Sequence, residues 1–404
     1  MKKLIALLLS LTLLFSCAVS VSAATVSTEY VGADLDTPLE NNVQANAVIG
    51  EKLNINAKSA VLIEYNTGKI LYEMNAGERL APASITKVMT LILVMEAIEE
   101  GKIKLETQVT ASAHAASLGG SQIWLEEGEV MTVDELLRAV VVASANDATV
   151  ALAEAVAGSE ETFVEKMNEK AKALGLKDTN FINSYGLDAD GHLTTAYDIA
   201  VMSSELIKHK LIRDYSTIKM DSLRNGESQL VNTNKLIRYY DGCFGLKTGT
   251  TGKAGSCLTA TAERNGLTLI AVVLGSPTSK DRFSGAQKLL DYGFANYSYT
   301  EVKAKTDEFT PISVKKGIEN SVMPEVTKSL PLLLSKGEES GITQSISIEQ
   351  ELTAPVKKGD IIGYVHVYLK DEEVGVIPIT AADTVERLSY FDCLIRLLRG
   401  LFTL

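Results

Sequence analysis

The sequence predicts an α+β fold in which a buried helical lobe packs against an antiparallel sheet, followed by a small all-β domain. Three observations lead to this prediction. Residues 84–99 are apolar on nearly all sides, which indicates a buried helix. Short β-prone runs separated by turns occur at 60–72 and 245–274. Beyond Tyr299, helical periodicity gives way to further β-like runs.

The N-terminal residues predict export from the cytoplasm. Two lysines, a short apolar stretch and a group of small residues follow one another over residues 1–24, which is typical of a secretory signal peptide. The apolar stretch is too short for a comfortable membrane span. A lipoprotein signal ending at Cys17 is the alternative, although the bulky Phe15 fits it poorly. Residues 25–50 are polar and aperiodic, and they are expected to form a flexible leader.

Residues 51–299 are expected to form the main domain. It begins with a hairpin around the turn Asn66-Thr67-Gly68 and continues, after Pro82, with the buried helix. Helical patterns follow at 133–144, 148–157, 161–174 and 195–208. A second hairpin and a third strand then complete the sheet, at 245–249, 256–262 and 267–274.

Two smaller segments complete the chain. Residues 300–382 are expected to form the small β domain, with strands near 346–348, 361–369 and 374–379. In residues 383–404, apolar side chains recur at helical spacing and arginines fall on the other side. That pattern favours an amphipathic helix that anchors the protein on a membrane surface. The alternative is a helix packed on the β domain.

Composition excludes several classes of function. The net charge of 39 − 51 = −12 argues against nucleic-acid binding. Cys243 and Cys257 could form a disulfide, but an odd, sparse cysteine set fits buried thiols better. The four histidines include no H-E-x-x-H motif, and no C-x-x-C occurs. The sequence therefore predicts no metal and no cofactor.

Three short motifs in a fixed order describe one active site. They are Ser84-Ile85-Thr86-Lys87, Ser144-Ala145-Asn146 and Lys247-Thr248-Gly249. Serine acyl transfer without a histidine needs an activated hydroxyl, a base, a second proton carrier and a clamp for the substrate, and these motifs supply all four. The pattern S-x-x-K also occurs at Ser216 and Ser313, but neither match is followed by the other two motifs. Motif order therefore selects Ser84.

Each residue of the first two motifs has an expected role. Ser84 is the candidate nucleophile, and Lys87, three residues later on the same helix face, is its base. Burial and a nearby second ammonium are expected to lower the pKa of Lys87. Ser144 is expected to relay a proton by linking the two lysines. The amide of Asn146 can donate to and accept from a substrate peptide group.

The third motif is expected to bind the substrate. Lys247 places a cation at the edge of the site, where it attracts a terminal carboxylate, and Thr248 can hydrogen-bond that carboxylate. Gly249 lets the substrate lie close against the strand. If the substrate pairs with this strand, the backbone N–H groups of Thr250 and Ser84 can form the oxyanion hole.

In these motifs the chain resembles the low-molecular-mass penicillin-binding proteins that are D-alanyl-D-alanine carboxypeptidases of the serine S11 type. The similarity extends to segments 81–87, 119–121, 145–148, 183–187, 245–251 and 254–255. The resemblance implies a penicillin-binding/β-lactamase-like transpeptidase fold. It also implies removal of the terminal D-alanine from peptidoglycan pentapeptide stems through an acyl-enzyme on Ser84. Such proteins are acylated by β-lactams and work at the outer face of the cytoplasmic membrane, held there by the C-terminal helix.

Two alternatives remain beside this interpretation. A class A β-lactamase uses a glutamate in an E-x-x-L-N context between the second and third motifs. Here only the segment 227–232 comes near that pattern, one residue out of register. A catalytically silent wall-binding protein is the other alternative, and the intact motifs argue against it.

Overall fold

The computed structural model describes residues 53–395 of the chain. The expected signal peptide and leader lie outside these residues, and so does the end of the expected anchor segment. Within 53–395, no helix combines the length and the apolar character needed to cross a membrane.

The main domain is built on a five-stranded antiparallel sheet in the order β2-β1-β9-β8-β7. Its strands are β1 Ser59–Glu64, β2 Ile70–Met74, β7 Cys243–Thr251, β8 Gly255–Arg264 and β9 Leu267–Ser276. Both predicted hairpins and the third strand are confirmed. Strand β7 lies at one edge of the sheet, next to β8 only.

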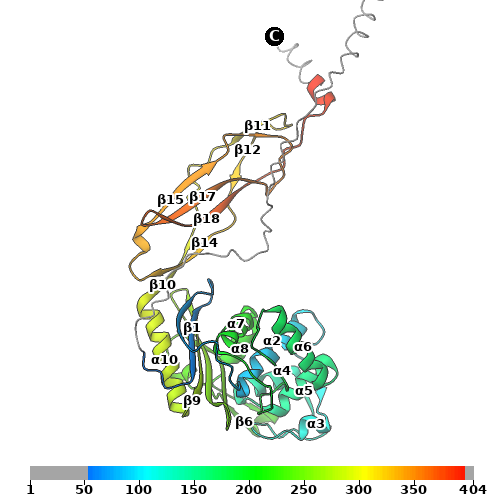
Figure 1. Ribbon diagram of the computed structural model, residues 1–404. Coiled ribbons are helices and arrows are strands. Elements are labelled where there is room, and N and C mark those ends of the chain that lie inside the picture. Colours follow the sequence, from blue (N-terminus) through cyan, green and yellow to red (C-terminus); the bar gives the residue numbers. More distant parts are fainter. Residues whose placement is uncertain (1–52, 396–404) are drawn as a thin grey trace, which may run out of the picture. The chain divides into compact units, whose positions relative to one another are not determined.

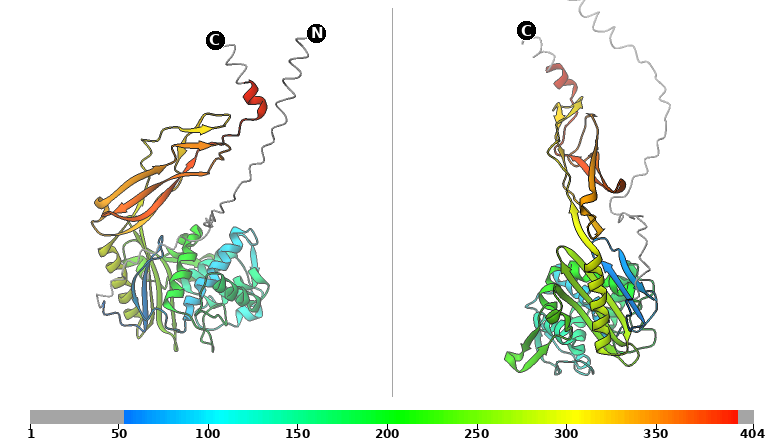
Figure 2. Two further views of the ribbon diagram at one scale, coloured as in Figure 1. Left: turned by 45° about the horizontal axis from the view of Figure 1, so that its top comes forward. Right: turned by 90° about the vertical axis from the view of Figure 1, so that its left-hand side faces the viewer.

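Both faces of this sheet are covered by helices. Side chains alternate along a strand, so Val61 of β1 joins the core under the helical lobe while Leu62 joins the core under α10 (Ser279–Asn296). Figures 1 and 2 show α10 along one face of the sheet and the helical lobe that contains α2 against the opposite face. Strands buried on both faces read as continuous apolar runs, which explains the sequence of β9.

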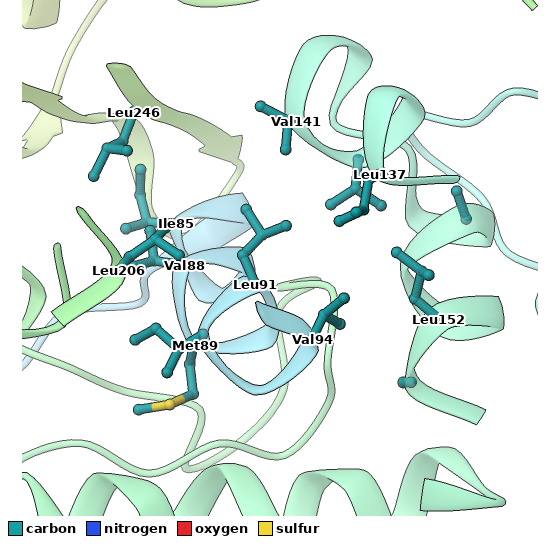
Figure 3. Close-up of a cluster of buried hydrophobic side chains, with 14 of the residues drawn as sticks. Ile85, Val88, Met89, Leu91, Val94, Leu137, Val141, Leu152, Leu206 and Leu246 are labelled. Atoms are coloured by element: carbon teal, nitrogen blue, oxygen red, sulfur yellow. The ribbon is translucent and has the colours of Figure 1, made fainter. Parts of the chain in front are cut away.

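The helical lobe surrounds α2 (Lys87–Glu99). Figure 3 shows Val88, Leu91 and Val94 of this helix among apolar side chains from several other elements. Four further helices overlap the predicted ranges: α4 Val133–Arg138, α5 Asn146–Ala157, α6 Glu160–Ala173 and α7 Ala196–Lys208. The shorter helices α3 Ala113–Ala116, α8 Lys210–Ser216 and α9 Leu236–Tyr239 had no predicted counterpart.

Two predicted helices differ where they meet the motifs. The helix expected from Ser84 begins as the 3-10 turn η2 (Ala83–Thr86), whose first residue, Ala83, has a φ of 49°. The helix α4 continues as the π-helical turn η3 (Ala139–Ala143) and ends at Ser144, whose φ is 64°. Such irregular turns store strain and are common at functional sites.

The predicted β-rich segment has its own apolar core. Its strands are β10 Tyr297–Val302, β11 Ile312–Lys315, β12 Ser321–Val322, β13 Pro324–Glu325, β14 Leu330–Ser335, β15 Ile342–Ile348, β16 Glu351–Thr353, β17 Ile361–Leu369 and β18 Glu372–Ala381. Contacts of this domain continue beyond residue 382, as far as the hydrogen bond from Leu388 N to Lys316 O. Val385 is buried in its core and bridges to Val356.

The chain then turns into a helical segment that begins at Tyr390. Ser389 precedes it as a cap, and its hydroxyl accepts a hydrogen bond from Asp392 N. Tyr390 and Phe391 are 80% and 72% exposed, and Leu394 and Ile395 also face solvent. Within the described part of the tail, these apolar side chains therefore do not pack against the β domain.

Candidate active site

The structure brings the three motifs together from four different elements. Ser84 lies in η2, Lys87 begins α2, and Asn146 begins α5. Lys87 Nζ lies 3.1 Å from Ser84 Oγ and 2.6 Å from Asn146 Oδ1. From β7, Lys247 Nζ donates to Ser144 Oγ at 2.7 Å.

The surroundings of Lys87 suit a neutral amine. Its side chain is wholly buried, and its third partner is the backbone carbonyl of Tyr185, at 2.6 Å. A carbonyl oxygen and an amide oxygen can only accept hydrogen bonds, so they take the two N–H groups of a neutral amine. The lone pair of that amine then faces Ser84, whose hydroxyl can donate to it. This is the arrangement that proton abstraction from Ser84 requires.

Burial is the main cause that lowers the pKa of Lys87 well below its usual range. The ammonium of Lys247 lowers it further, while the carboxylate of Asp147 opposes both effects. Asp147 is itself buried and accepts hydrogen bonds from the backbone N–H groups of Ile123 and Leu125. The net pKa shift therefore favours the neutral form of Lys87, which is the form a general base requires.

Lys247 occupies a different place from the one expected. It lies buried beneath the site, 1% exposed, where the sequence predicted a cation at its edge. Besides Ser144, it donates to the carbonyl of Thr248 at 3.0 Å. Burial, aided by the charge of Arg282, lowers its pKa to about 7. A lysine on a strand of alternating side chains can point inward or outward, and the motif alone does not distinguish the two.

Ser144 was expected to link the two lysines, and the structure shows one half of this link. Its hydroxyl accepts from Lys247, whereas Lys87 uses its hydrogen-bonding positions on Ser84, Asn146 and Tyr185. A proton can therefore pass between Ser144 and Lys247 directly.

Thr248, Gly249 and the following Thr250 lie on the edge strand β7. Thr248 Oγ1 donates to Thr233 Oγ1, and Thr250 Oγ1 donates to the carbonyl of Gly249. Arg282, from α10, donates to that same carbonyl at 2.9 Å and to Thr250 Oγ1 at 2.8 Å. The sequence analysis assigned no role to Arg282, because only the packing of α10 against the sheet brings it to β7.

Gly249 has a close neighbour within the protein. A Cβ placed on it would lie 2.9 Å from Ser84 N and 3.0 Å from Pro82 O. Only a residue without a side chain lets β7 approach the turn that carries the nucleophile this closely. The predicted approach of substrate to this strand stays a prediction.

Replacing Gly249 with alanine is expected to slow acylation of Ser84 by on the order of 10²-fold, because the added methyl group displaces the Ser84 turn. The measurement is the second-order rate constant for labelling by a fluorescent penicillin. Gly252→Ala is the matched control, since a Cβ at this position in the same hairpin meets nothing within 4 Å. Equal rate constants for the two variants would contradict the packing role.

Two loops, residues 119–121 and 183–187, hold Asn146 and Lys87 in place. The sequence analysis assigned no function to either loop. Asn146 Nδ2 donates to Gly119 O, and Asn146 N donates to Ser121 O. A Cβ on Gly186 would lie 2.0 Å from Ala83 O, so the segment that carries Tyr185 also packs directly on the Ser84 turn. Both segments belong to the stretches that carry the resemblance described above.

His192 stabilises the turn η2, which carries Ser84, through a contact with Thr86. Its Nδ1 accepts from Ile182 N, so its Nε2 must carry the proton and donate to Thr86 Oγ1, 2.8 Å away. Thr86 in turn donates to the carbonyl of Ala83. Burial lowers the pKa of His192 to about 4, so this chain of hydrogen bonds stays intact at neutral pH.

The cysteines and the acidic groups add no second reactive centre to this site. Cys243 and Cys257 are free thiols, and in the register of β7 and β8 they lie opposite different residues. Burial raises the pKa of Cys243 to about 11. Over residues 53–395, the structure contains no cluster of three or more His, Cys, Asp or Glu side chains suited to a metal ion.

Comparison with known proteins agrees with this geometry. The model of the peptidase S11 family, described as D-alanyl-D-alanine carboxypeptidase, matches residues 44–278. The model of the penicillin-binding protein 5 C-terminal domain matches residues 297–387.

Individual relatives cover most of the chain. The D-alanyl-D-alanine carboxypeptidase DacF of Bacillus subtilis is 44% identical over 344 residues, which are 84% of this chain and 88% of that protein. The crystal structure of penicillin-binding protein 5 from Haemophilus influenzae is 33% identical, has a TM-score of 0.71, and matches 82% of this chain and 98% of its own. The ampicillin-bound form of penicillin-binding protein D2 from Listeria monocytogenes is 32% identical, has a TM-score of 0.56, and matches 60% and 100%.

Proposed function

The chain belongs to the peptidase S11 family of D-alanyl-D-alanine carboxypeptidases, and we propose that its reaction proceeds through an acyl-enzyme on Ser84, with Lys87 as the base. The observation that carries this proposal is the position of Lys87 Nζ, between the Ser84 hydroxyl and two oxygens that can only accept. The protein is a serine hydrolase, and its substrates are the pentapeptide stems of peptidoglycan.

Acylation requires two proton transfers: one from the attacking Ser84 hydroxyl and one to the amine that leaves. Lys87 takes the proton of Ser84 while Ser84 Oγ attacks the carbonyl carbon of the penultimate D-alanine. When the amide bond breaks, the leaving amine of the terminal D-alanine takes a proton from the Ser144 hydroxyl, which Lys247 replenishes through their 2.7 Å hydrogen bond. Water then attacks the ester carbonyl: one proton of the water passes through Ser144 to Lys247, and Lys87 returns its proton to Ser84 Oγ as the ester bond breaks.

The substrate lies along the free edge of β7. An edge strand offers unpaired backbone groups to an extended peptide, and the N–H groups of Ser84 and Thr250 serve as the oxyanion hole. Each of the two polar atoms in the amide of Asn146 has one remaining hydrogen-bonding position for the substrate. Lys247, Thr248 and Arg282 make this end of the site attractive to the terminal carboxylate.

A labelling assay tests the activity against its alternatives. The protein is mixed with a fluorescent penicillin, and D-alanine release from a pentapeptide stem is measured in parallel. A retained label together with D-alanine release supports the carboxypeptidase. Rapid loss of the label indicates a β-lactamase, and the absence of labelling indicates a silent wall-binding protein.

The rate of acylation is expected to follow a bell-shaped dependence on pH. The rate rises with pH as Lys87 loses its proton, because only the neutral amine can act as the base. It falls above about pH 7, where Lys247 loses the charge that attracts the carboxylate and supplies the proton. The acid limb is assigned to Lys87, because burial and the charge of Lys247 both lower its pKa well below the usual range of a lysine. The measurement is the acylation rate constant between pH 5 and 10, and a rate that rises monotonically to pH 10 would contradict this assignment.

We further propose that the protein is exported and held on the outer face of the cytoplasmic membrane by the segment after Leu388. The exposed apolar side chains of Tyr390, Phe391, Leu394 and Ile395 support this proposal. Removal of residues 389–404 is expected to release the protein from membranes with its peptidase activity unchanged. The cut follows Leu388 because residues up to that point contact the β domain.

Membrane association is measured by sedimentation with lipid vesicles. Phe391→Ser together with Leu394→Ser is expected to weaken binding in the full chain, whereas Tyr239→Ser, at an exposed site in the main domain, leaves it unchanged. Continued vesicle binding by the truncated protein would refute the anchor.

A further inference from the structure

The carbonyl of Tyr185 contacts the proposed base from a segment that has no regular secondary structure. Neither a helix nor a strand therefore sets the orientation of this peptide group. Side chains from other parts of the fold must hold it, because a shift of about 1 Å at such a contact is enough to reduce a rate by about 100-fold.

Glu160 supplies the most direct of these restraints. It is the first residue of α6, it is 8% exposed, and it points toward Ser184, the neighbour of Tyr185. One carboxylate oxygen accepts hydrogen bonds from both Ser184 N, at 2.9 Å, and Ser184 Oγ, at 2.8 Å. A single acceptor thus fixes the backbone and the side chain of this residue.

The opposite side of Ser184 is tied to the helix of the base. Thr90 Oγ1 donates to the carbonyl of Ser184 at 2.6 Å, and Thr90 lies three residues after Lys87, on the same face of α2. Ser184 is wholly buried. Ser184 is therefore held between Glu160 and α2, and the carbonyl of the next residue, Tyr185, is directed at Lys87.

The second oxygen of Glu160 is also occupied. His114 Nε2 lies 2.6 Å from it, and the imidazole must donate, because a carboxylate can only accept. A buried carboxylate is costly unless it is fully hydrogen-bonded, so these contacts account for its stability in this position. Interaction with the helix dipole alone does not account for it, since the exposed Glu161 offers a negative charge in the same first turn.

We propose that Glu160 is a positioning residue for the general base: its carboxylate holds Ser184 so that the carbonyl of Tyr185 accepts one N–H of Lys87 and the lone pair of the amine faces Ser84. This inference rests on the proposed role of Lys87. It adds a residue 73 positions away in the sequence, on a helix that carries none of the three motifs.

Four variants test the proposal in the full chain: Glu160→Ala, Glu160→Gln, Ser184→Ala and the matched control Glu161→Ala. The readouts are the rate constant for penicillin acylation from pH 5 to 10, kcat and KM for D-alanine release, and the Tm. The fraction of protein that takes up label at saturation corrects each rate for inactive molecules.

Glu160→Ala is expected to lower the acylation rate constant and kcat by about 10- to 100-fold, with KM changed less than about threefold. Glu160→Gln is expected to stay within about threefold of the parent, because its amide oxygen accepts from the same two donors of Ser184. Ser184→Ala removes one of these donors and is expected to cost about three- to tenfold. Glu161→Ala is expected to behave as the parent protein.

The pH profile distinguishes positioning from simple loss of structure. A carbonyl stabilises an ammonium more strongly than a neutral amine, so a displaced Tyr185 carbonyl lowers the pKa of Lys87. The acid limb of the profile in Glu160→Ala is therefore expected to move to lower pH. A purely structural role would lower the Tm and the labelled fraction and leave this limb in place.

Glu160→Ala with the rate and profile of Glu161→Ala would overturn the proposal, and so would equal losses in Glu160→Ala and Glu160→Gln. If Glu160→Ala does not fold, Ser184→Ala decides the question, and an unchanged rate in that variant overturns the proposal. Failure of the premise looks different. Lys87→Met with the parent's acylation rate would refute the base itself, whereas an inactive Lys87→Met beside a fully active Glu160→Ala refutes only the positioning role.

Discussion

Replacing Ser84 with alanine is expected to abolish both penicillin labelling and D-alanine release, with a loss of at least about 10⁴-fold in kcat. The oxygen of this hydroxyl forms the ester, and among the hydrogen-bond partners of Lys87 within residues 53–395, Ser84 is the one that contacts the amine through a hydroxyl. The turn η2 is held by the backbone, by Thr86 and by the close packing of Gly186, and none of these contacts uses the Ser84 side chain. The variant should therefore keep the parent's Tm.

Ser313→Ala is the matched control for this variant. Ser313 also begins an S-x-x-K match, but it lies exposed on β11 in the β domain. Labelling and D-alanine release should be unchanged. Retained activity in Ser84→Ala would place the nucleophile elsewhere.

Replacing Lys87 with methionine is expected to have the second largest effect. The change keeps most of the apolar volume of the side chain but removes the amine that, within residues 53–395, contacts the Ser84 hydroxyl and can take its proton. Loss of a general base typically costs about 10²–10⁴-fold, and the acylation rate constant should fall by that factor. The measurement is stopped-flow mixing with a fluorescent penicillin. The pH profile of the remaining rate should also lack the acid limb.

Lys102→Met, at an exposed lysine shortly after α2, serves as the control and should acylate as the parent protein does. A Lys87→Met variant that acylates within about threefold of the parent would contradict the role of this amine.

Much of the fold could be predicted from the sequence, because local patterns determine it. The continuous apolar character of α2 and the two hairpins follow from periodicity and turn residues, and the structure confirms them. The order of the three motifs predicted that Ser84, Lys87, Ser144, Asn146 and Lys247 meet, and the hydrogen bonds between them form two separate groups, Ser84-Lys87-Asn146 and Ser144-Lys247.

The remaining features depend on contacts between distant parts of the chain. The 3-10 start at Ala83 accompanies the close approach of Gly186, about one hundred residues later. The burial of Lys247 depends on which face of β7 meets the helical lobe. Tyr185 contributes through its backbone carbonyl, which no side-chain motif records, and Glu160 acts on it through Ser184. For the same reason, the sequence did not predict that Val385 belongs to the core of the β domain.

Mass spectrometry of the penicillin adduct is the most direct measurement of the central claim. The labelled protein is digested, and the peptide that carries the added mass is sequenced by fragmentation. The adduct is expected on the peptide that contains Ser84, at the Ser84 side chain itself, in the parent protein and in Glu160→Ala alike. An adduct on any other residue, or none in protein that still releases D-alanine, would contradict an acyl-enzyme at Ser84.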